Sequence, residues 1–150
     1  MKWVTRANVN VDRVSCPWLI RTFVDQEAEF IFAAPEQTAA VVWEQGAIPY
    51  DASGVALGRH GPECSFDAIL KTYGLTDPAL RQLALIVRGV DTDAKDLTPE
   101  SRGSEAVAEE FHRMAQDGGY NDHETNRREW IVYDVLYRFC GGDAARLQGQ

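Results

Sequence analysis

Two short segments gather charged residues where the building of a core does not need them. One runs from His60 to Asp67 and carries an imidazole, a thiol and two carboxylates, and the other, from Ile86 to Thr92, carries Arg88 and Asp91. Helix ends offer unpaired backbone groups and partial charges to a ligand, so charged residues gathered there can hold an anion or a metal ion. These segments are the first candidates for a binding site.

Several arginines stand out as candidate ligands of an oxyanion in an otherwise acidic chain. A guanidinium group is a planar fork that binds planar or tetrahedral oxyanions through two hydrogen bonds. The competing interpretation is an ion pair with a neighbouring carboxylate, as between Arg88 and Asp91 at i,i+3. The candidates are Arg6, Arg13, Arg21 and Arg88, of which Arg13 and Arg88 lie beside predicted helix ends.

His60 and Glu63 have the i,i+3 spacing of a metal-ligand pair, and Asp91 could add an oxygen ligand for a divalent ion. The ion would be manganese, iron, nickel or zinc. A loop histidine satisfied by the backbone is the competing interpretation of His60. If the protein is an enzyme, which the sequence leaves open, the catalytic candidates are Arg13, His60, Arg88 and Asp91.

Two further residues have both a structural and a functional interpretation. Asp134 is a carboxylate in the most apolar predicted helix, and it needs a partner if it is buried. It is either a hydrogen-bonded core carboxylate or a support for the site that holds His60 or an arginine. Cys64, near a helix N-terminus, is a candidate for a lowered thiol pKa, but burial beside Phe66 is the simpler expectation.

Composition narrows the class of protein. A chain of 150 residues with 45% hydrophobic and 25% charged residues is typical of one globular domain, and we expect a single domain over residues 1–150. The net charge of −8 disfavours nucleic acid as a partner, although residues 1–25 carry four basic residues against two acidic ones. No GxSxG, Walker, GxGxxG or HExxH motif occurs, which excludes the commonest hydrolase, nucleotide-binding and zincin classes.

The location and assembly of the protein follow from equally general features. The sequence shows no secretory signal and no apolar stretch long enough to cross a membrane. Three cysteines without a CxxC pair fit reduced thiols, so we expect a cytoplasmic protein without a membrane partner. A homodimer is expected on base rates alone.

Hydrophobic spacing predicts strands first and helices later. The predicted strands cover residues 2–6 and 28–33, and an irregular hairpin covers 47–57 around an Asp-Ala-Ser-Gly turn. Predicted helices cover 12–25, 35–45, 65–73, 77–89, 104–116 and 123–140, with a polar loop over 91–102. The last helix is apolar nearly all round, so we expect it to be central. The fold class is α+β, with a small N-terminal mixed sheet packed against a mainly helical C-terminal layer.

Over residues 2–140 the chain resembles the chromate-resistance ChrB domain family, which also occurs fused behind rhodanese-like sulfurtransferase domains. The resemblance rests on five ordered motifs, at residues 3–6, 11–21, 60–67, 86–92 and 132–137. At Asn121-Asp122-His123 the chain departs from the paired aspartates of the family. The resemblance implies a link to chromate, as a sensor that regulates resistance genes or as an accessory protein, and it establishes no reaction. Chromate is a tetrahedral dianion, which suits the arginine interpretation.

Three hypotheses about function follow. The first is a domain that binds a small oxyanion or a divalent metal through Arg13, His60, Arg88 and Asp91 and passes this occupancy to a partner or a gene-regulatory complex. The second is a small metal-dependent enzyme that acts on an anionic small molecule, with arginine stabilising negative charge in the substrate. The third and weakest is a DNA-binding regulator that uses the basic residues among the first 25.

Overall fold

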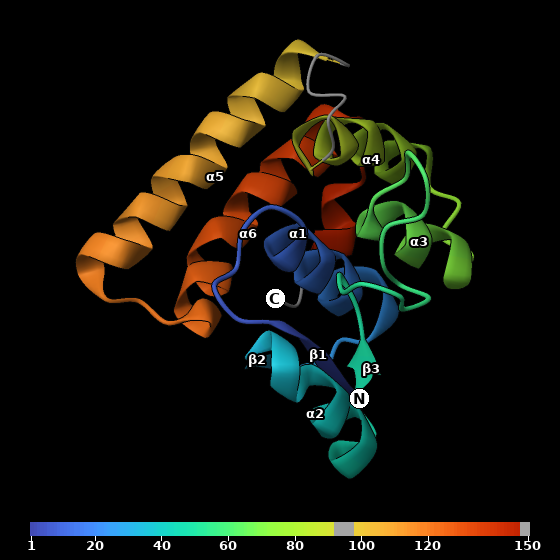
Figure 1. Cartoon of the computed structure of the whole chain (residues 1–150). Coiled ribbons are helices and arrows are strands. Elements are labelled where there is room, and N and C mark those ends of the chain that lie inside the picture. Colours follow the sequence, from blue (N-terminus) through green and yellow to red (C-terminus); the bar gives the residue numbers. More distant parts are fainter. Residues whose placement is uncertain (92–97, 148–150) are drawn as a thin grey trace.

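A three-stranded parallel sheet begins the fold, and helices make up most of the rest (Figure 1). The computed structural model describes residues 1–91 and 98–147. The central strand β1 (Lys2–Arg6) pairs along its length with β2 (Glu29–Ala33) and, on its other edge, with β3 (Ile48–Pro49). The expected α+β class, with an N-terminal sheet against a helical layer, is confirmed, but the strand pairs are parallel and not mixed.

Helices cover both faces of the sheet. Successive side chains of β1 point alternately to one face and to the other, and the apolar ones on each face need a covering layer. Trp3 joins the main core on the face of α1 (Asp12–Leu19), which continues as a π-helical turn over Ile20–Val24. Val4 points to the opposite face and forms a small second core with Ala33 and Ala47. This second core lies under α2 (Thr38–Gln45), which follows a 3-10 turn over Pro35–Gln37.

The predicted hairpin over residues 47–57 is wrong. β3 runs parallel to β1, and Tyr50 forms an isolated parallel bridge with Leu57. β2 pairs with one edge of β1, so the other edge of β1 is free to pair with β3. The Tyr50 N–H extends the pairing of β3 with β1 by donating a hydrogen bond to the Val4 carbonyl (3.1 Å). The segment after β2 therefore adds to the existing sheet and forms no ladder of its own.

The helical part follows the predicted order. It consists of α3 (Ser65–Thr72), α4 (Pro78–Asp91), α5 (Pro99–Gly118) and α6 (Asp122–Phe139), with a 3-10 turn over Ala144–Leu147. The predicted start of α5 at Ser104 is wrong, because the Thr98 hydroxyl accepts a hydrogen bond from the Ser101 N–H (3.1 Å) and Pro99 opens the helix. Of the predicted loop, residues 92–97 lie outside the described residues.

The main core surrounds α1, which packs against the sheet and α6. Trp18 is fully buried in it, and its ring lies about 6 Å from those of Tyr133 and Tyr137 of α6 (6.0 Å each between centroids). The expectation that α6 is central is correct for this inner face only, because Ile131 and Val135 on the outer face are 58% exposed. α5 runs along the outer side of α6 (Figure 1). Among the described residues, no helix is long and apolar enough to cross a membrane.

Candidate functional site

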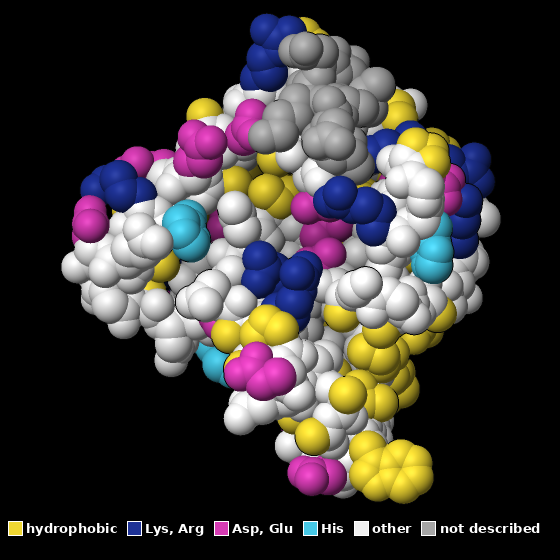
Figure 2. Space-filling model, in the orientation of Figure 1, with side chains coloured by type: hydrophobic (Ala, Val, Ile, Leu, Met, Phe, Trp, Pro, Cys, Tyr) yellow, Lys and Arg dark blue, Asp and Glu magenta, His cyan; other side chains and the backbone are white. Residues whose placement is uncertain are grey.

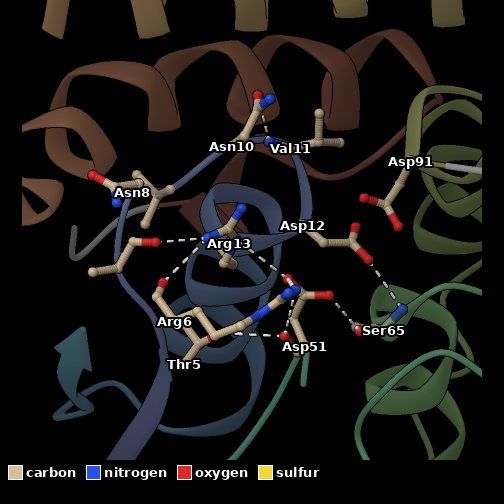
Figure 3. Close-up of polar contacts among 12 residues, drawn as sticks. Thr5, Arg6, Asn8, Asn10, Val11, Asp12, Arg13, Asp51, Ser65 and Asp91 are labelled. Atoms are coloured by element: carbon tan, nitrogen blue, oxygen red, sulfur yellow. Dashed lines mark hydrogen bonds and ion pairs between the residues drawn. The ribbon is translucent and has the colours of Figure 1, made fainter. Parts of the chain in front are cut away.

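Polar side chains gather where the chain reverses the direction in which it adds strands. From β1 the chain passes through α1 to β2 on one edge, and from β2 through α2 to β3 on the opposite edge. Such a reversal leaves a crevice at the carboxyl ends of the two adjacent strands, and α/β proteins bind ligands there. Arg6 ends β1 and Asp51 follows β3, so both lie at this end of the sheet (Figure 3).

We call the charged residues gathered at this end of the sheet the polar centre. They come from the ends of two strands, the start of α1 and the end of α4, and they carry charges of both signs (Figure 3). Its members are Arg6, Asp12, Arg13, Asp51 and Asp91. On the surface, acidic side chains appear near the middle of this face with Lys or Arg side chains on two sides of them (Figure 2).

Two arginines share one carboxylate on the basic side of the polar centre. Arg6 Nη2 and Arg13 Nε each lie 3.5 Å from Asp51 Oδ2, which is a loose contact for a charged pair. Arg13 Nη1 also donates to the carbonyl of Ala7 (2.8 Å), and Arg6 Nη2 donates to the carbonyl of Asp51 (3.2 Å). Neither guanidinium therefore forms a two-pronged pair with a carboxylate in these contacts.

The two guanidinium groups are incompletely compensated. Burial lowers the pKa of Arg13, and the nearby charge of Arg6 lowers it further, while Asp51 acts in the opposite direction. Arg6 Nε is buried and has no hydrogen-bond partner among the residues that the structure describes. A buried donor without a partner costs stability, and such a donor in a native structure calls for an explanation, for example an ion or ligand that binds there.

The acidic side of the polar centre holds two carboxyls, Asp12 and Asp51, whose pKa values are raised. Asp12 is 1% exposed, and its Oδ2 accepts a hydrogen bond from the Ser65 N–H (3.0 Å) at the start of α3. Burial raises the pKa of Asp12 well above its usual range, and the charges of Asp91 and Asp51 raise it further. The pKa of Asp51 is also raised, by burial first and then by Asp91. These carboxyls therefore favour a proton or a cation.

A third arginine closes the outer side of this group. Arg59 Nη2 lies 2.8 Å from Asp91 Oδ2 and also donates to the Asp91 carbonyl. The hydrogen bond that Arg59 donates to the Asp91 carboxylate raises the pKa of Arg59. Asp91 is thus held at the end of α4 between a cation at the surface and the buried Asp12 carboxyl.

The loop between β1 and α1 is fixed from a distant part of the chain. The Asp122 carboxylate at the start of α6 accepts hydrogen bonds from the N–H groups of Asn8 (3.0 Å) and Val9 (2.9 Å). Asn8 has a φ of 63°, a left-handed conformation that Asn adopts more readily than most residues. The carbonyls that hold Arg13 belong to the same loop, so Asp122 contributes to the position of that guanidinium.

The structure brings together three of the predicted site residues, Arg6, Arg13 and Asp91. Arg88 lies one turn before Asp91, but its guanidinium binds Asp67 of α3 (2.7 Å). Arg21 donates to the Ala28 carbonyl (3.3 Å) and lines a separate pocket of about 770 Å³ beside α6. The predicted pair of Arg88 with Asp91 is not among these contacts.

The predicted metal ligands each have another partner. His60 Nε2 lies 2.8 Å from the Ala56 carbonyl, Glu63 binds Lys71 Nζ (2.5 Å), and Asp91 pairs with Arg59. Residues 1–91 and 98–147 contain no group of three or more His, Cys, Asp or Glu side chains arranged to hold a metal ion.

The two residues with competing interpretations both have structural surroundings. Asp134 Oδ1 accepts a hydrogen bond from Trp18 Nε1 (2.8 Å), which ties α6 to α1 and fits the interpretation as a hydrogen-bonded carboxylate. Cys64 is fully buried, and burial raises the pKa of its thiol, so the candidate lowered pKa is wrong.

Sequence reasoning missed four residues of this arrangement, namely Asp12, Asp51, Arg59 and Asp122 as a loop anchor. From the sequence, Asp12 only begins a predicted helix and Asp51 only belongs to a predicted turn. The available signal was positional, since Asp12 and Asp51 each follow a predicted strand and parallel strands align their carboxyl ends. This positional signal identifies the site only when the order of the strands in the sheet is known.

The fold and the polar centre define a small α+β domain with charged side chains gathered at the carboxyl ends of its parallel strands. The chain belongs to the family of the ChrB C-terminal domain, whose model matches residues 3–140. Protein ChrB of Cupriavidus metallidurans is 32% identical over 107 residues, which is 71% of this chain. The chain spans about a third of the length of that curated relative, of which the match covers 32%. No solved structure matches the chain significantly.

Proposed function

We propose that this domain binds a small tetrahedral oxyanion, with chromate as the physiological candidate, at the polar centre through Arg6 and Arg13. Binding would be passed to a partner or a gene-regulatory complex, in keeping with a role in chromate resistance. The observation that carries the proposal is the sharing of Asp51 by two guanidinium groups at 3.5 Å each. Arg88, which we expected to take part, binds Asp67 and is not included.

A bound oxyanion would supply the hydrogen-bond acceptors and the negative charge that the two guanidinium groups lack in this arrangement. Arg6 Nε has no described partner and burial disfavours the charge of Arg13, so an anion between them would gain charged hydrogen bonds and relieve the burial cost. The start of α1 lies at the same place, and the positive end of a helix dipole favours anions. These contributions act on one location from two parts of the chain, the end of β1 and the start of α1.

The neighbouring carboxylates do not prevent anion binding, because a protonated carboxyl carries no charge. The raised pKa of Asp12 favours its neutral form, which can donate a hydrogen bond to an oxyanion. Asp51 would move from a shared partner of the arginines to a neighbour of the anion. Anion binding should therefore take up protons, and affinity should weaken as pH rises.

Calorimetric titration of the purified chain with chromate, sulfate and phosphate at constant ionic strength tests the proposal. We expect binding by the wild type, and a loss of about tenfold to a hundredfold in affinity for Arg13→Gln, the worth of one charged hydrogen bond. Arg6→Gln should weaken binding in the same direction, and its side chain is 43% exposed, so the variant should fold. Arg113→Gln, which removes an exposed charge on α5, is the matched control.

Two results contradict the proposal. One is a wild-type protein that binds none of the three anions, and the other is an Arg13→Gln variant with wild-type affinity and an unchanged melting temperature. A loss of affinity that is equal in Arg113→Gln would indicate a general charge effect and not a site.

A divalent metal is our second proposal, and mutual repulsion in the acidic part of the polar centre favours it. A cation among Asp12, Asp51 and Asp91 would replace the proton that the raised pKa values of Asp12 and Asp51 favour, although the three carboxylates would have to draw together to ligate it. His60 and Glu63 remain candidate ligands. With manganese, iron, nickel or zinc in place, the small metal-dependent enzyme becomes the corresponding function.

Elemental analysis of protein purified without chelator separates the two proposals. Stoichiometric metal that is lost in Asp91→Asn but kept in Asp117→Asn would support the metal site at the polar centre. Metal lost only in His60→Ala would place it at His60 instead. We also propose that the protein acts in the cytoplasm and as a homodimer.

A further inference from the structure

The outer face of α6 carries a stripe of large apolar side chains in contact with solvent. Ile131 and Val135 are 58% exposed and Phe139 is 66% exposed. They follow one another at intervals of four residues, which places them on one side of the helix. Single exposed apolar residues are common, but a continuous row on one helix face is typical of an interaction surface.

The stripe borders a groove between α5 and α6. The groove has a volume of about 500 Å³, and its lining is almost wholly apolar on the α6 side, whereas α5 contributes Glu100, Gly103, Ser104 and Val107. Small residues on α5 leave this space open. A second apolar helix could enter it by packing its ridge into the groove.

α5 is poorly buried for its length. Of its 20 residues only Ser101, Ser104 and Ala108 are buried, and all three are small. Helices of this length owe most of their stability in water to packing of an apolar face. The hairpin of α5 and α6 therefore presents a face that lacks part of its packing.

We propose that this face binds a second copy of the chain, so that two α5–α6 hairpins form a four-helix bundle across a two-fold axis. The axis runs parallel to the helices and places α5 of each copy over α6 of the other. The stripe of Ile131, Val135 and Phe139 then enters the groove of the partner, and the partner's stripe enters this one. The proposal identifies the surface that a homodimer would use.

Charge complementarity points to a second copy as the occupant. Glu100 on α5 lies in the groove wall near the end of α6, where Arg138 is exposed. Neither side chain has an ion-pair partner among the described residues. The two-fold axis parallel to the helices sets Glu100 of one copy opposite Arg138 of the other, twice per dimer. A surface that carries an unpaired negative charge and an unpaired positive charge at the same end is complementary to a second copy of itself in this arrangement.

The oligomeric state of the purified chain tests this proposal. Sedimentation velocity at protomer concentrations of about 1 to 100 µM should show a dimer, a range that detects dissociation constants typical of weak to moderate association. Val135→Glu should raise the dissociation constant by more than about tenfold, because it buries a carboxylate at the centre of the interface. Trp43→Glu replaces an apolar side chain of α2 that is 89% exposed and should leave the dimer intact.

A charge exchange provides the second arm. Arg138→Glu and Glu100→Arg should each weaken the dimer by placing like charges opposite one another, and the double variant should restore it. A wild-type monomer at every concentration overturns the proposal and leaves the groove to a different protein. A dimer that survives Val135→Glu but is lost in Trp43→Glu overturns it as well and places the interface at α2. Oxyanion binding by a monomer would leave the proposed oxyanion site standing and would contradict the proposed homodimer.

Discussion

Arg88 of α4 binds Asp67 of α3 through both branches of its guanidinium group, with Nε 3.0 Å from Oδ2 and Nη2 2.7 Å from Oδ1. The same carboxylate accepts a hydrogen bond from the Cys64 N–H (3.1 Å) and so caps α3. One ion pair thus joins two helices and closes the end of one of them. It also accounts for a charged residue in the segment from Ile86 to Thr92 without assigning it to ligand binding.

Arg88→Met should lower the free energy of unfolding by about 2 to 3 kcal/mol, because it leaves the Asp67 carboxylate buried without its cation. The Asp67 side chain is 7% exposed and that of Arg88 is 25% exposed, so solvent screens the pair only weakly. Urea denaturation measures the change. The double variant Asp67→Asn with Arg88→Met should lose less than the sum of the two single variants. Unchanged stability with weakened oxyanion binding would instead place Arg88 in the site.

Glu129 makes the stability of the fold depend on pH. It lies buried on α6, and burial raises the pKa of its carboxyl from 4.5 to about 8. The folded protein holds this proton more tightly than the unfolded chain does. The free energy of unfolding therefore falls as pH rises from about 4.5 to about 8, and the loss is complete above that range.

Glu129→Gln keeps the shape of the side chain and removes its titration. Between pH 5 and pH 8.5 the variant should lose less stability than the wild type, by about 2 to 5 kcal/mol. Urea denaturation at the two pH values measures this difference. Glu109→Gln, at an exposed position of α5, is the control and should follow the wild-type profile. Parallel profiles for wild type and Glu129→Gln would show that Glu129 is not the titrating group.

The limit of sequence reasoning is visible in Arg13 and its partners. The pattern after the first strand predicted Arg13 as a ligand, because local spacing places it at a helix start. Its neighbour Asp51 is 38 positions further along the chain and reaches it only because β3 pairs in parallel with β1. Spacing along the chain carries no information about that pairing, and the hairpin prediction placed the segment on the wrong partner.

Local sequence patterns predicted the helices correctly in order. One helix start was predicted wrongly because a clearer capping pattern nearby was overlooked. The start of α5 was predicted at Ser104, although Thr98-Pro99 has the form of a cap followed by a proline. Arg88 illustrates the opposite case, since its partner Asp67 is 21 positions away and belongs to another helix. Choosing between Asp67 and Asp91 required knowledge of how α3 and α4 pack.

The hydrogen bond between Trp18 and Asp134 should contribute to stability and not to ligand binding. Asp134→Ala leaves the buried Trp18 Nε1 without an acceptor and should lower the free energy of unfolding by about 1 to 3 kcal/mol. Asp134→Asn keeps an acceptor oxygen and should stay close to the wild type. Denaturation and oxyanion titration of both variants test this. A loss of oxyanion affinity in the stable Asp134→Asn would revive the interpretation of Asp134 as a support of the site.

The anchoring of the β1–α1 loop by Asp122 should affect both stability and the polar centre. Asp122→Ala removes the acceptor of the Asn8 and Val9 N–H groups and should lower the free energy of unfolding by about 1 to 3 kcal/mol. Hydrogen exchange at these two amides should become faster, because their bonds no longer protect them. Asp117→Ala removes an exposed carboxylate of α5 and is the matched control.

Oxyanion affinity in Asp122→Ala distinguishes two effects of opposite sign. Removing a negative charge near Arg13 favours an anion, and Asp122 does act electrostatically on Arg13. Releasing the loop disfavours it, because the Arg6 and Ala7 carbonyls that orient the guanidinium are no longer fixed. Orientation governs charged hydrogen bonds more strongly than a screened charge does, so we expect the affinity to fall. A rise in affinity would mean that Asp122 acts through its charge alone and that the loop does not position Arg13.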